Sequence, residues 1–443
     1  MQKQTPTSPG FHRRIGLIVI GLGIFIFCTG LIINPWAGRL YRPNMLKYQD
    51  VMLNYAVWAW SLGLLIAGLG ALMRRMKSAL VGNLVVLTLT CSLIILSDRY
   101  LLAKIGLPLW VADMEKHYAH RPNTIRSWGP NYDHRLIRIN QYGHHDDDFP
   151  VAKPAGELRG VIIGDSITMG HGMRYEETFP NQLEAILSEQ AGGPTTFQMI
   201  NTGVQGYSTI QEYYTLLESL RFEPDFIALG FCMNDLTEPF VVDKRFGGIG
   251  TDYHGIAQAS SHAISYILNE TGYGRWLQQR QKRGKSLKLE RRWEVFSVRK
   301  IAQSSMDDPQ FAVNWKTTFD YLDKIYDTAA EKKIKIVLLI FPHTFQLMDT
   351  KVQEPQRQLI RHAAARGIPV IDFTTVFERL IFDARVVAEL ADYGFSYDDI
   401  HGLYDSKIRK YFLDQDHYTV EGHRVVASHL QSYVSDHFSF ERK

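Results

Sequence analysis

Three places in this sequence carry side chains that together could attack an ester. Ser166 and Asn234 each follow a short apolar run, and Asp414 lies three residues before His417, ahead of the last helical pattern. A serine hydroxyl is a weak nucleophile unless a base takes its proton, and histidine, with an unperturbed pKa of about 6.5, suits that task. A nearby carboxylate can hold the other ring nitrogen. These residue types predict acyl transfer through Ser166, His417 and Asp414.

Attack on a carbonyl creates an oxyanion, which needs hydrogen-bond donors directed at it. The backbone N–H of Ser166 and the side-chain amide of Asn234 are candidate donors. A third candidate comes from the turn after the second apolar run, where Gly203 and Gly206 both occur. A glycine there lets substrate approach the backbone closely. The residues alone leave the choice between the two glycines open.

Several neighbouring residues have competing interpretations. Asp416 is an alternative to Asp414 as the carboxylate that orients the histidine. His423 lies six residues after that histidine, on the following helical pattern, and is predicted to be structural. Asp165 and Asp235 are predicted to brace neighbouring backbone and amide groups and not to act on substrate.

The elements that position these residues alternate along the second part of the chain. Nearly continuous apolar runs, as in strands buried on both faces, occur at 160–164, 197–201, 226–231, 334–341 and 370–373. Helical patterns separate them at 179–187, 210–220, 312–330, 354–366 and 420–434. This alternation predicts an α/β fold, a doubly wound three-layer αβα sandwich with a five-stranded parallel sheet. Ligands bind beyond the carboxyl ends of such strands, where the polar residues lie.

Four blocks in chain order resemble the SGNH, or GDSL-type, hydrolase family, from about residue 160 to 430. They are Gly164-Asp165-Ser166-Ile167-Thr168-Met169-Gly170, Gly206, Asn234-Asp235 and Asp414-x-x-His417. The matching family glycine is Gly206, which leaves Gly203 as a turn residue. The Gly-x-Ser-x-Gly elbow of the α/β-hydrolases is absent around Ser166, which argues against that fold.

The resemblance implies a flavodoxin-like SGNH fold and an esterase, lipase or carbohydrate deacetylase. It also implies the site residues: Ser166, Asp414 and His417 as the catalytic triad, with Ser166, Gly206 and Asn234 as the oxyanion hole. No metal or organic cofactor is implied. We expect a serine esterase that hydrolyses an O-acyl or acetyl ester of a cell-surface glycan or lipid. Two alternatives are an O-acyltransferase for an exported polysaccharide and a catalytically idle glycan-binding or scaffold protein.

The chain is predicted to have three parts. Residues 1–97 contain uncharged runs at about 15–33, 51–73 and 78–97, long enough to predict three transmembrane helices and an all-α membrane anchor. Residues 98–158 lack periodic patterns and are predicted to be a linker packed on the catalytic domain. Residues 159–443 form the hydrolase domain, interrupted by an insertion at 236–309.

The distribution of Lys and Arg predicts the orientation of this anchor. Six of these cations lie before the first run or between the second and third, against five on the other side. The majority side is expected to be cytoplasmic, which places the catalytic domain outside the cytoplasm. Membrane lipid is therefore a predicted partner, and nucleic acid is not.

Two charged segments have alternative interpretations. Residues 144–148, His-His-Asp-Asp-Asp, contain metal-ligand types, but consecutive side chains on an extended loop point in different directions, so no metal site is predicted. Residues 275–300 contain ten Lys or Arg and only two Glu. This stretch is either a solvated helix face or a contact for anionic lipid headgroups or an acidic glycan.

Composition excludes several protein classes. The 443 residues are 45% hydrophobic and 21% charged with a net charge of +3, which is atypical of disordered chains. Only 3 cysteines are present, too few for a disulfide framework in a chain of this length. The oligomeric state is not indicated.

Overall fold

The computed structural model describes most of the chain, in two compact units, Met1–Lys104 and Ile105–Lys443. The described residues are 9–33, 49–75, 79–105, 109–113, 115–236, 271–274, 276, 298–303, 306, 308–309 and 311–440. Most of the predicted insertion at 236–309 and nearly all of the basic stretch at 275–300 lie outside these residues.

The first unit contains helices at the three positions predicted from the uncharged runs. They are α1 (Pro9–Ile33), α3 (Gln49–Arg75) and α4 (Ala79–Ile105). Each helix extends past its uncharged run and takes in charged residues, such as Arg13 in α1, Asp50 in α3 and Asp98 in α4. A membrane span needs about 20 consecutive apolar residues in one helix. Among the described residues no helix is long and apolar enough to cross a bilayer, so the predicted transmembrane region is not supported.

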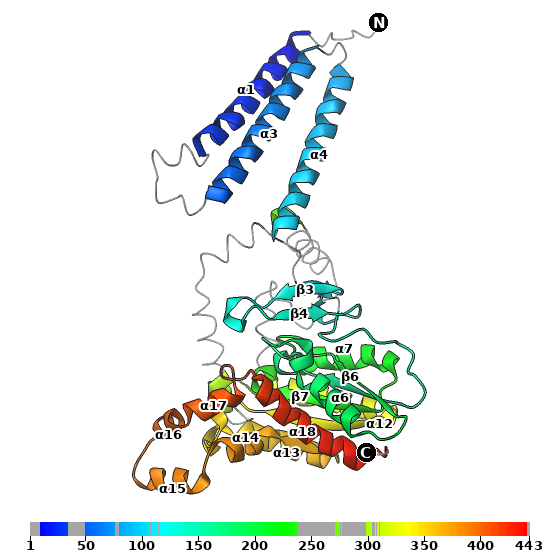
Figure 1. The fold of residues 1–443 in the computed structure, drawn as a ribbon, viewed down its shortest axis with the longest axis vertical. Helices are drawn as coiled ribbons and strands as arrows, with labels where there is room; N and C mark the ends of the chain where they lie inside the picture. Colours follow the sequence, from blue (N-terminus) through cyan, green and yellow to red (C-terminus); the bar gives the residue numbers. More distant parts are fainter. Residues whose placement is uncertain are drawn as a thin grey trace. The chain divides into compact units, whose positions relative to one another are not determined.

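The second unit is built on a five-stranded sheet, and this part of the sequence prediction is confirmed (Figure 1). Its strands are β5 (Glu157–Ile163), β6 (Thr196–Asn201), β7 (Phe226–Cys232), β8 (Lys335–Phe341) and β9 (Val370–Asp372). They pair in the order β6-β5-β7-β8-β9, and every pair is parallel. The chain order reverses between β5 and β7, which is where ligands bind in flavodoxin-like sheets.

Helices cover both faces of this sheet, because successive strand residues point to opposite sides. Along β8, Val337 and Leu339 pack in one hydrophobic cluster, whereas Ile336 and Leu338 pack in the other. The first cluster includes residues of α6 (Phe179–Gln190), α14 (Phe373–Ile381), α16 (Tyr397–Leu403), α17 (Asp405–Tyr411) and α18 (Val420–His437). The second includes residues of α7 (Thr209–Ser219), α12 (Ala312–Glu331) and α13 (Glu354–Ala365).

The described part of this unit also contains shorter helices. They are α5 (Ser166–Met169), α15 (Ala384–Asp392) and the 3-10 turns η2 (Pro130–Tyr132), η3 (Tyr175–Glu177), η4 (Leu220–Phe222), η5 (Met233–Leu236), η6 (Thr344–Gln346) and η7 (Thr350–Val352). The sequence patterns predict no helix between β9 and α18, yet this segment contains four helices, α14 to α17.

The segment predicted to be an irregular linker contains two antiparallel hairpins. The first pairs β1 (Trp110–Asp113) with β2 (His117–His120), and the second pairs β3 (Thr124–Ser127) with β4 (Leu136–Ile139). Each strand has only four residues, too few for period-2 alternation to be evident in the sequence. Both hairpins contact the hydrolase core: Tyr118 packs with Tyr207, and Ile137 packs with Met169.

Candidate active site

Ser166 lies at the carboxyl edge of the sheet, where β5 gives way to the short helix α5. The Asp165 side chain caps this helix by accepting a hydrogen bond from the Ile167 N–H at 2.9 Å. The turn after β6 packs directly against α5, since a Cβ on Gly203 would overlap the backbone nitrogen of Met169. A side chain at position 203, which was predicted to be a turn glycine, would therefore not fit between this turn and α5.

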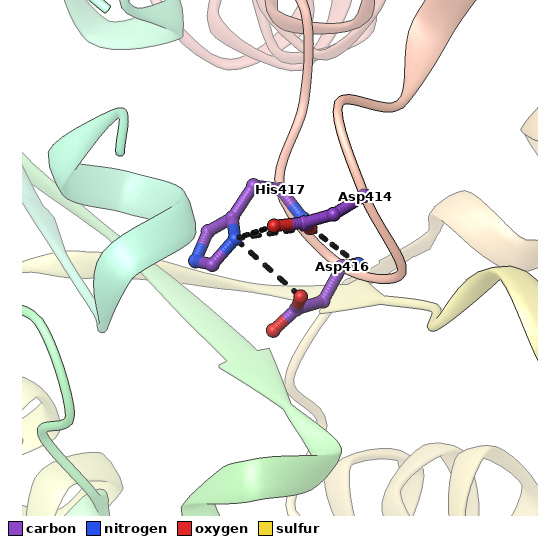
Figure 2. A group of neighbouring side chains, drawn as sticks. All are labelled: Asp414, Asp416 and His417. Atoms are coloured by element: carbon purple, nitrogen blue, oxygen red, sulfur yellow. Dashed lines mark hydrogen bonds and ion pairs between the residues drawn. The ribbon is translucent and has the colours of Figure 1, made fainter. Parts of the chain in front are cut away.

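The structure brings the three predicted triad residues together, although 251 residues separate Ser166 from His417. The Nε2 atom of His417 lies 2.9 Å from the Ser166 Oγ. On the other side of the ring, Nδ1 lies 2.9 and 3.0 Å from the two carboxylate oxygens of Asp414. Figure 2 shows the Asp414 carboxylate directed at the ring. Hydroxyl, imidazole and carboxylate thus form one hydrogen-bonded series.

A closed loop presents the acid and the base of this series. Phe412 and Tyr418 form an antiparallel bridge, and the Leu413 N–H donates to the His417 carbonyl at 2.8 Å. Within the loop, the Asp414 carboxylate also accepts from the backbone N–H of His417 at 3.0 Å. One carboxylate therefore holds both the backbone and the ring of His417, which restricts the ring to one orientation.

Asp416 is the alternative orienting carboxylate by spacing, and the geometry favours Asp414. An Asp416 oxygen lies 3.5 Å from Nδ1 of His417, beyond the two Asp414 contacts (Figure 2). Its other oxygen lies 3.9 Å from Nε2 of the buried His343. Asp416 thus lies between the imidazole rings of His417 and His343 and is a second carboxylate beside His417.

Opposing influences set the pKa of His417. Burial disfavours the charged ring and lowers the pKa, whereas the carboxylates of Asp416, Asp414 and Asp165 raise it. The carboxylates prevail, and the pKa of His417 rises to about 9. Burial acts to raise the pKa of Asp414, but its bonds with His417 prevail and lower it; burial raises the pKa of Asp416 to about 7. At neutral pH, His417 and Asp414 therefore favour an imidazolium–carboxylate pair.

The predicted oxyanion donors lie at neighbouring strand ends. Asn234 follows β7, and its side-chain amide donates to the Asp165 carboxylate at 2.9 Å, which orients the amide beside the serine. Asp235 accepts from the Cys232 N–H at 2.9 Å and holds the same turn. Gly206 has φ +74°, in the left-handed region that glycine adopts without strain. Asp165 and Asp235 brace backbone and amide groups, in agreement with the sequence interpretation.

His423 and the segment 144–148 have separate structural partners. The buried His423 accepts from the Phe179 N–H at 3.3 Å, as expected for a structural residue. Asp146 accepts from Asn201 N–H at 3.0 Å, whereas Asp147 pairs with Arg138 at 2.6 Å. These acidic side chains therefore point to different partners.

Within the described part of the chain, one group of three metal-ligand types has its atoms within 4.8 Å: Asp414, Asp416 and His417. Both ring nitrogens of His417 are already engaged, Nδ1 by Asp414 and Nε2 by Ser166. A cation at Nδ1 would have to displace the Asp414 carboxylate from the ring. The bonding of this group fits a proton relay.

One histidine at the site was missed by reasoning from the sequence. The ring of His171 lies 4.4 Å from that of His417 between centroids. His171 contacts the Tyr132 hydroxyl at 2.7 Å and the side chain of Gln205, while Trp128 packs against its ring edge at 4.7 Å. Its position five residues after the serine was the available signal. Tyr132 and Trp128, from the β3–β4 hairpin, carried no such signal.

The chain is similar to a protein family and to several solved structures. A family model described as the GDSL-like Lipase/Acylhydrolase family matches residues 162–425. Similar solved structures include the acetyl xylan esterase AlAXEase, at 15% identity over 62% of this chain and 100% of that chain, with a TM-score of 0.35. TesA is 10% identical over 63% of this chain and 100% of that chain, with a TM-score of 0.34. A lipase/acylhydrolase from Enterococcus faecalis is 12% identical over 65% of this chain and 100% of that chain, with a TM-score of 0.33. The comparison with curated proteins found no match.

A parallel αβα domain with a serine, a histidine and an aspartate in hydrogen-bonded series has the arrangement of a serine hydrolase. The family match spans more than half of the 443 residues, and the chain belongs to the GDSL-like lipase/acylhydrolase family. It is an enzyme that hydrolyses ester bonds. The predicted SGNH- or GDSL-type hydrolase is thereby confirmed at the level of the family.

Proposed function

We propose that the enzyme is a serine esterase that removes an O-acyl group, such as acetyl, from a glycan or lipid through an acyl-serine intermediate. The observation that carries this proposal is the contact of 2.9 Å between the Ser166 Oγ and Nε2 of His417, with Asp414 on the opposite ring nitrogen. In this arrangement a neutral His417 accepts the hydroxyl proton as Oγ attacks the ester carbonyl carbon.

The remaining steps use the same groups. The carbonyl oxygen becomes an oxyanion, for which the N–H groups of Ser166 and Gly206 and the amide of Asn234 are the proposed donors. The intermediate collapses, and the His417 imidazolium protonates the departing alcohol. Water then attacks the acyl-serine with His417 again as base, which releases the carboxylic acid and restores Ser166.

Fluorophosphonate labelling tests the nucleophile, and p-nitrophenyl acetate and palmitate test the acyl length. We expect labelling of Ser166, and the ratio of the two turnover rates gives the preferred acyl length. The same assay with added sugar acceptors distinguishes hydrolysis from the O-acyltransferase alternative, because a transferase produces an acylated sugar in place of free acid. Folded enzyme that is not labelled would contradict the proposed nucleophile.

Asn234→Ala should lower kcat by about 10² to 10³ and leave KM nearly unchanged. The physical reason is that an oxyanion donor stabilises charge that develops only after attack. Steady-state kinetics with p-nitrophenyl acetate measures both constants. A loss confined to KM would show that the amide binds the ground state and would rule out this role.

The pH dependence should report the pKa of His417. Only the neutral ring can accept the serine proton, so kcat/KM should rise with pH and level off above about 9, the pKa of His417. Asp416→Asn removes a negative charge that raises this pKa, so the rise should move to lower pH by roughly one pH unit or more. A pH–rate profile of both enzymes measures the shift. An unchanged profile would contradict an electrostatic effect of Asp416.

The position of the hydrolase domain outside the cytoplasm stays a prediction from the Lys and Arg distribution. Protease added to intact cells tests this prediction. The readout is cleavage of the hydrolase domain, so it does not depend on the role of the residues before 105. Digestion of the domain in intact cells supports the prediction. Protection until the cells are opened would contradict it and favour an intracellular ester as substrate.

A further inference from the structure

The proposed oxyanion donor Gly206 occupies the third position of a tight turn. The Tyr207 N–H donates to the Val204 carbonyl at 3.2 Å, which closes a β-turn with Gln205 and Gly206 at its centre. Gly206 has a positive φ of 74°, whereas Gln205 does not have a positive φ, and this combination defines a type II turn. Type I and type II turns differ by a flip of the central peptide. That peptide contains the Gln205 carbonyl and the Gly206 N–H.

The hydroxyl of Tyr118 contacts this central peptide. Tyr118 Oη donates to the carbonyl oxygen of Gln205 at 2.7 Å. The carbonyl and the N–H of a trans peptide point in opposite directions, so a partner that holds the Gln205 oxygen also holds the direction of the Gly206 N–H. Withdrawal of electron density toward that partner strengthens the N–H as a donor, because hydrogen bonds in series polarise one another.

Tyr118 is itself held in place by the turn that it contacts. Tyr207 donates from its hydroxyl to the Tyr118 carbonyl at 2.6 Å, and the two rings pack edge to face at 5.4 Å. On the other side, Trp110 of β1 packs edge to face on Tyr118 at 5.3 Å. Tyr118 and Tyr207 are 6% and 1% exposed, so water does not compete freely for these hydrogen bonds. Two hydrogen bonds therefore join the β1–β2 hairpin to the turn, one from each tyrosine hydroxyl.

We propose that Tyr118 is a positioning residue for ester hydrolysis, which holds the Gln205–Gly206 peptide with its N–H presented to the oxyanion. This inference rests on the proposed role of Gly206. It adds a group from outside the family match at 162–425, because Tyr118 belongs to the β1–β2 hairpin. The hairpin is then part of the catalytic arrangement and not only a connection to the first unit.

Tyr118→Phe tests this role, because it removes the hydroxyl and keeps the ring that packs between Trp110 and Tyr207. We expect kcat for p-nitrophenyl acetate to fall about 3- to 10-fold, the effect of one uncharged hydrogen bond, with KM nearly unchanged. Affinity for a phenylboronic acid, which forms a charged tetrahedral adduct with a serine, should fall by a similar factor.

Tyr207→Phe is the matched control. It removes a hydroxyl from the same cluster, but that hydroxyl bonds the Tyr118 backbone and not the Gln205–Gly206 peptide. We expect a smaller loss of kcat than in Tyr118→Phe, because the Tyr118 hydroxyl can still contact the Gln205 carbonyl. Equal kcat values for the two variants, or a loss in Tyr118→Phe that falls entirely on KM, would overturn the inference.

If Tyr118→Phe also lowers thermal stability, a double-mutant cycle of kcat values with Gly206→Ala still tests the inference. Gly206→Ala disturbs the positive φ that the turn requires, so Tyr118→Phe should cause little further loss of kcat in that background. Full additivity would overturn the inference. Ser166→Ala and Asn234→Ala are assayed in parallel. Wild-type kcat in both variants would contradict the proposed active site. Loss of kcat in both, with an unchanged kcat in Tyr118→Phe, would contradict only the role of Tyr118.

Discussion

Ser166→Ala should lower kcat for ester hydrolysis by about 10⁶, the loss seen when a serine nucleophile is removed. Without Oγ no acyl-serine forms, and the remaining oxyanion donors can assist only direct attack by water. His417→Ala should cause a similar loss, since the hydroxyl then has no base at 2.9 Å. Initial rates with p-nitrophenyl acetate and quenched-flow detection of the acyl-enzyme measure both effects.

The double variant Ser166→Ala/His417→Ala is the informative control. Ser166 and His417 act in the same step, so removal of either one abolishes the contribution of both to kcat. The double variant should therefore be no slower than either single variant. Thermal unfolding should be close to that of the wild type in Ser166→Ala, because the change removes one small hydroxyl. Residual turnover above about one per cent in Ser166→Ala would indicate another nucleophile.

Asp414→Asn should lower kcat by about 10⁴, the second largest effect. The carboxylate holds both the ring and the backbone of His417, and an amide that donates to Nδ1 would favour the wrong tautomer. The same substitution should lower the pKa of His417, because it removes a carboxylate that raises it. Steady-state rates measured between pH 6 and 10 separate the loss of rate from the shift in pKa.

Asp416→Asn is the matched variant for this comparison. Asp416 lies 3.5 Å from the same ring nitrogen, so it contributes charge without the shorter bonds of Asp414. Its substitution should shift the pH profile and reduce kcat far less than Asp414→Asn does. If Asp416→Asn caused the greater loss at every pH, Asp416 and not Asp414 would be the orienting carboxylate.

The sheet and the four blocks at its edge were predictable because each depends on local sequence. Buried parallel strands are nearly continuous apolar runs, and the five runs correspond to β5 to β9. The carboxyl ends of parallel strands meet at one edge, so residues that follow them gather there whatever their separation in the chain. The strand pattern therefore suffices to place Ser166 and Asn234 at the same edge of the sheet, and the neighbouring positions of β5 and β7 come from the structure.

The first hundred residues contain the part of the prediction that the structure does not support. Uncharged runs of about twenty residues predicted three membrane spans, and helices do occur at these positions. No helix in the described part of the chain has the length and apolarity for a crossing. A run of uncharged residues establishes that a helix is compatible with the sequence, but it does not establish the environment of that helix.

The linear sequence determined the residue types, their order and the sheet edge at which Ser166, Asn234 and His417 meet. The resemblance favoured Asp414 over Asp416 as the carboxylate that holds His417. The tertiary structure shows the contact itself, since the loop closed by Phe412 and Tyr418 places Asp414 nearer to the ring than Asp416. It also placed the Tyr118 hydroxyl on the Gln205 carbonyl, 87 residues away. Contacts of this kind depend on how separate elements pack, and periodicity within one element carries no information about its distant partners.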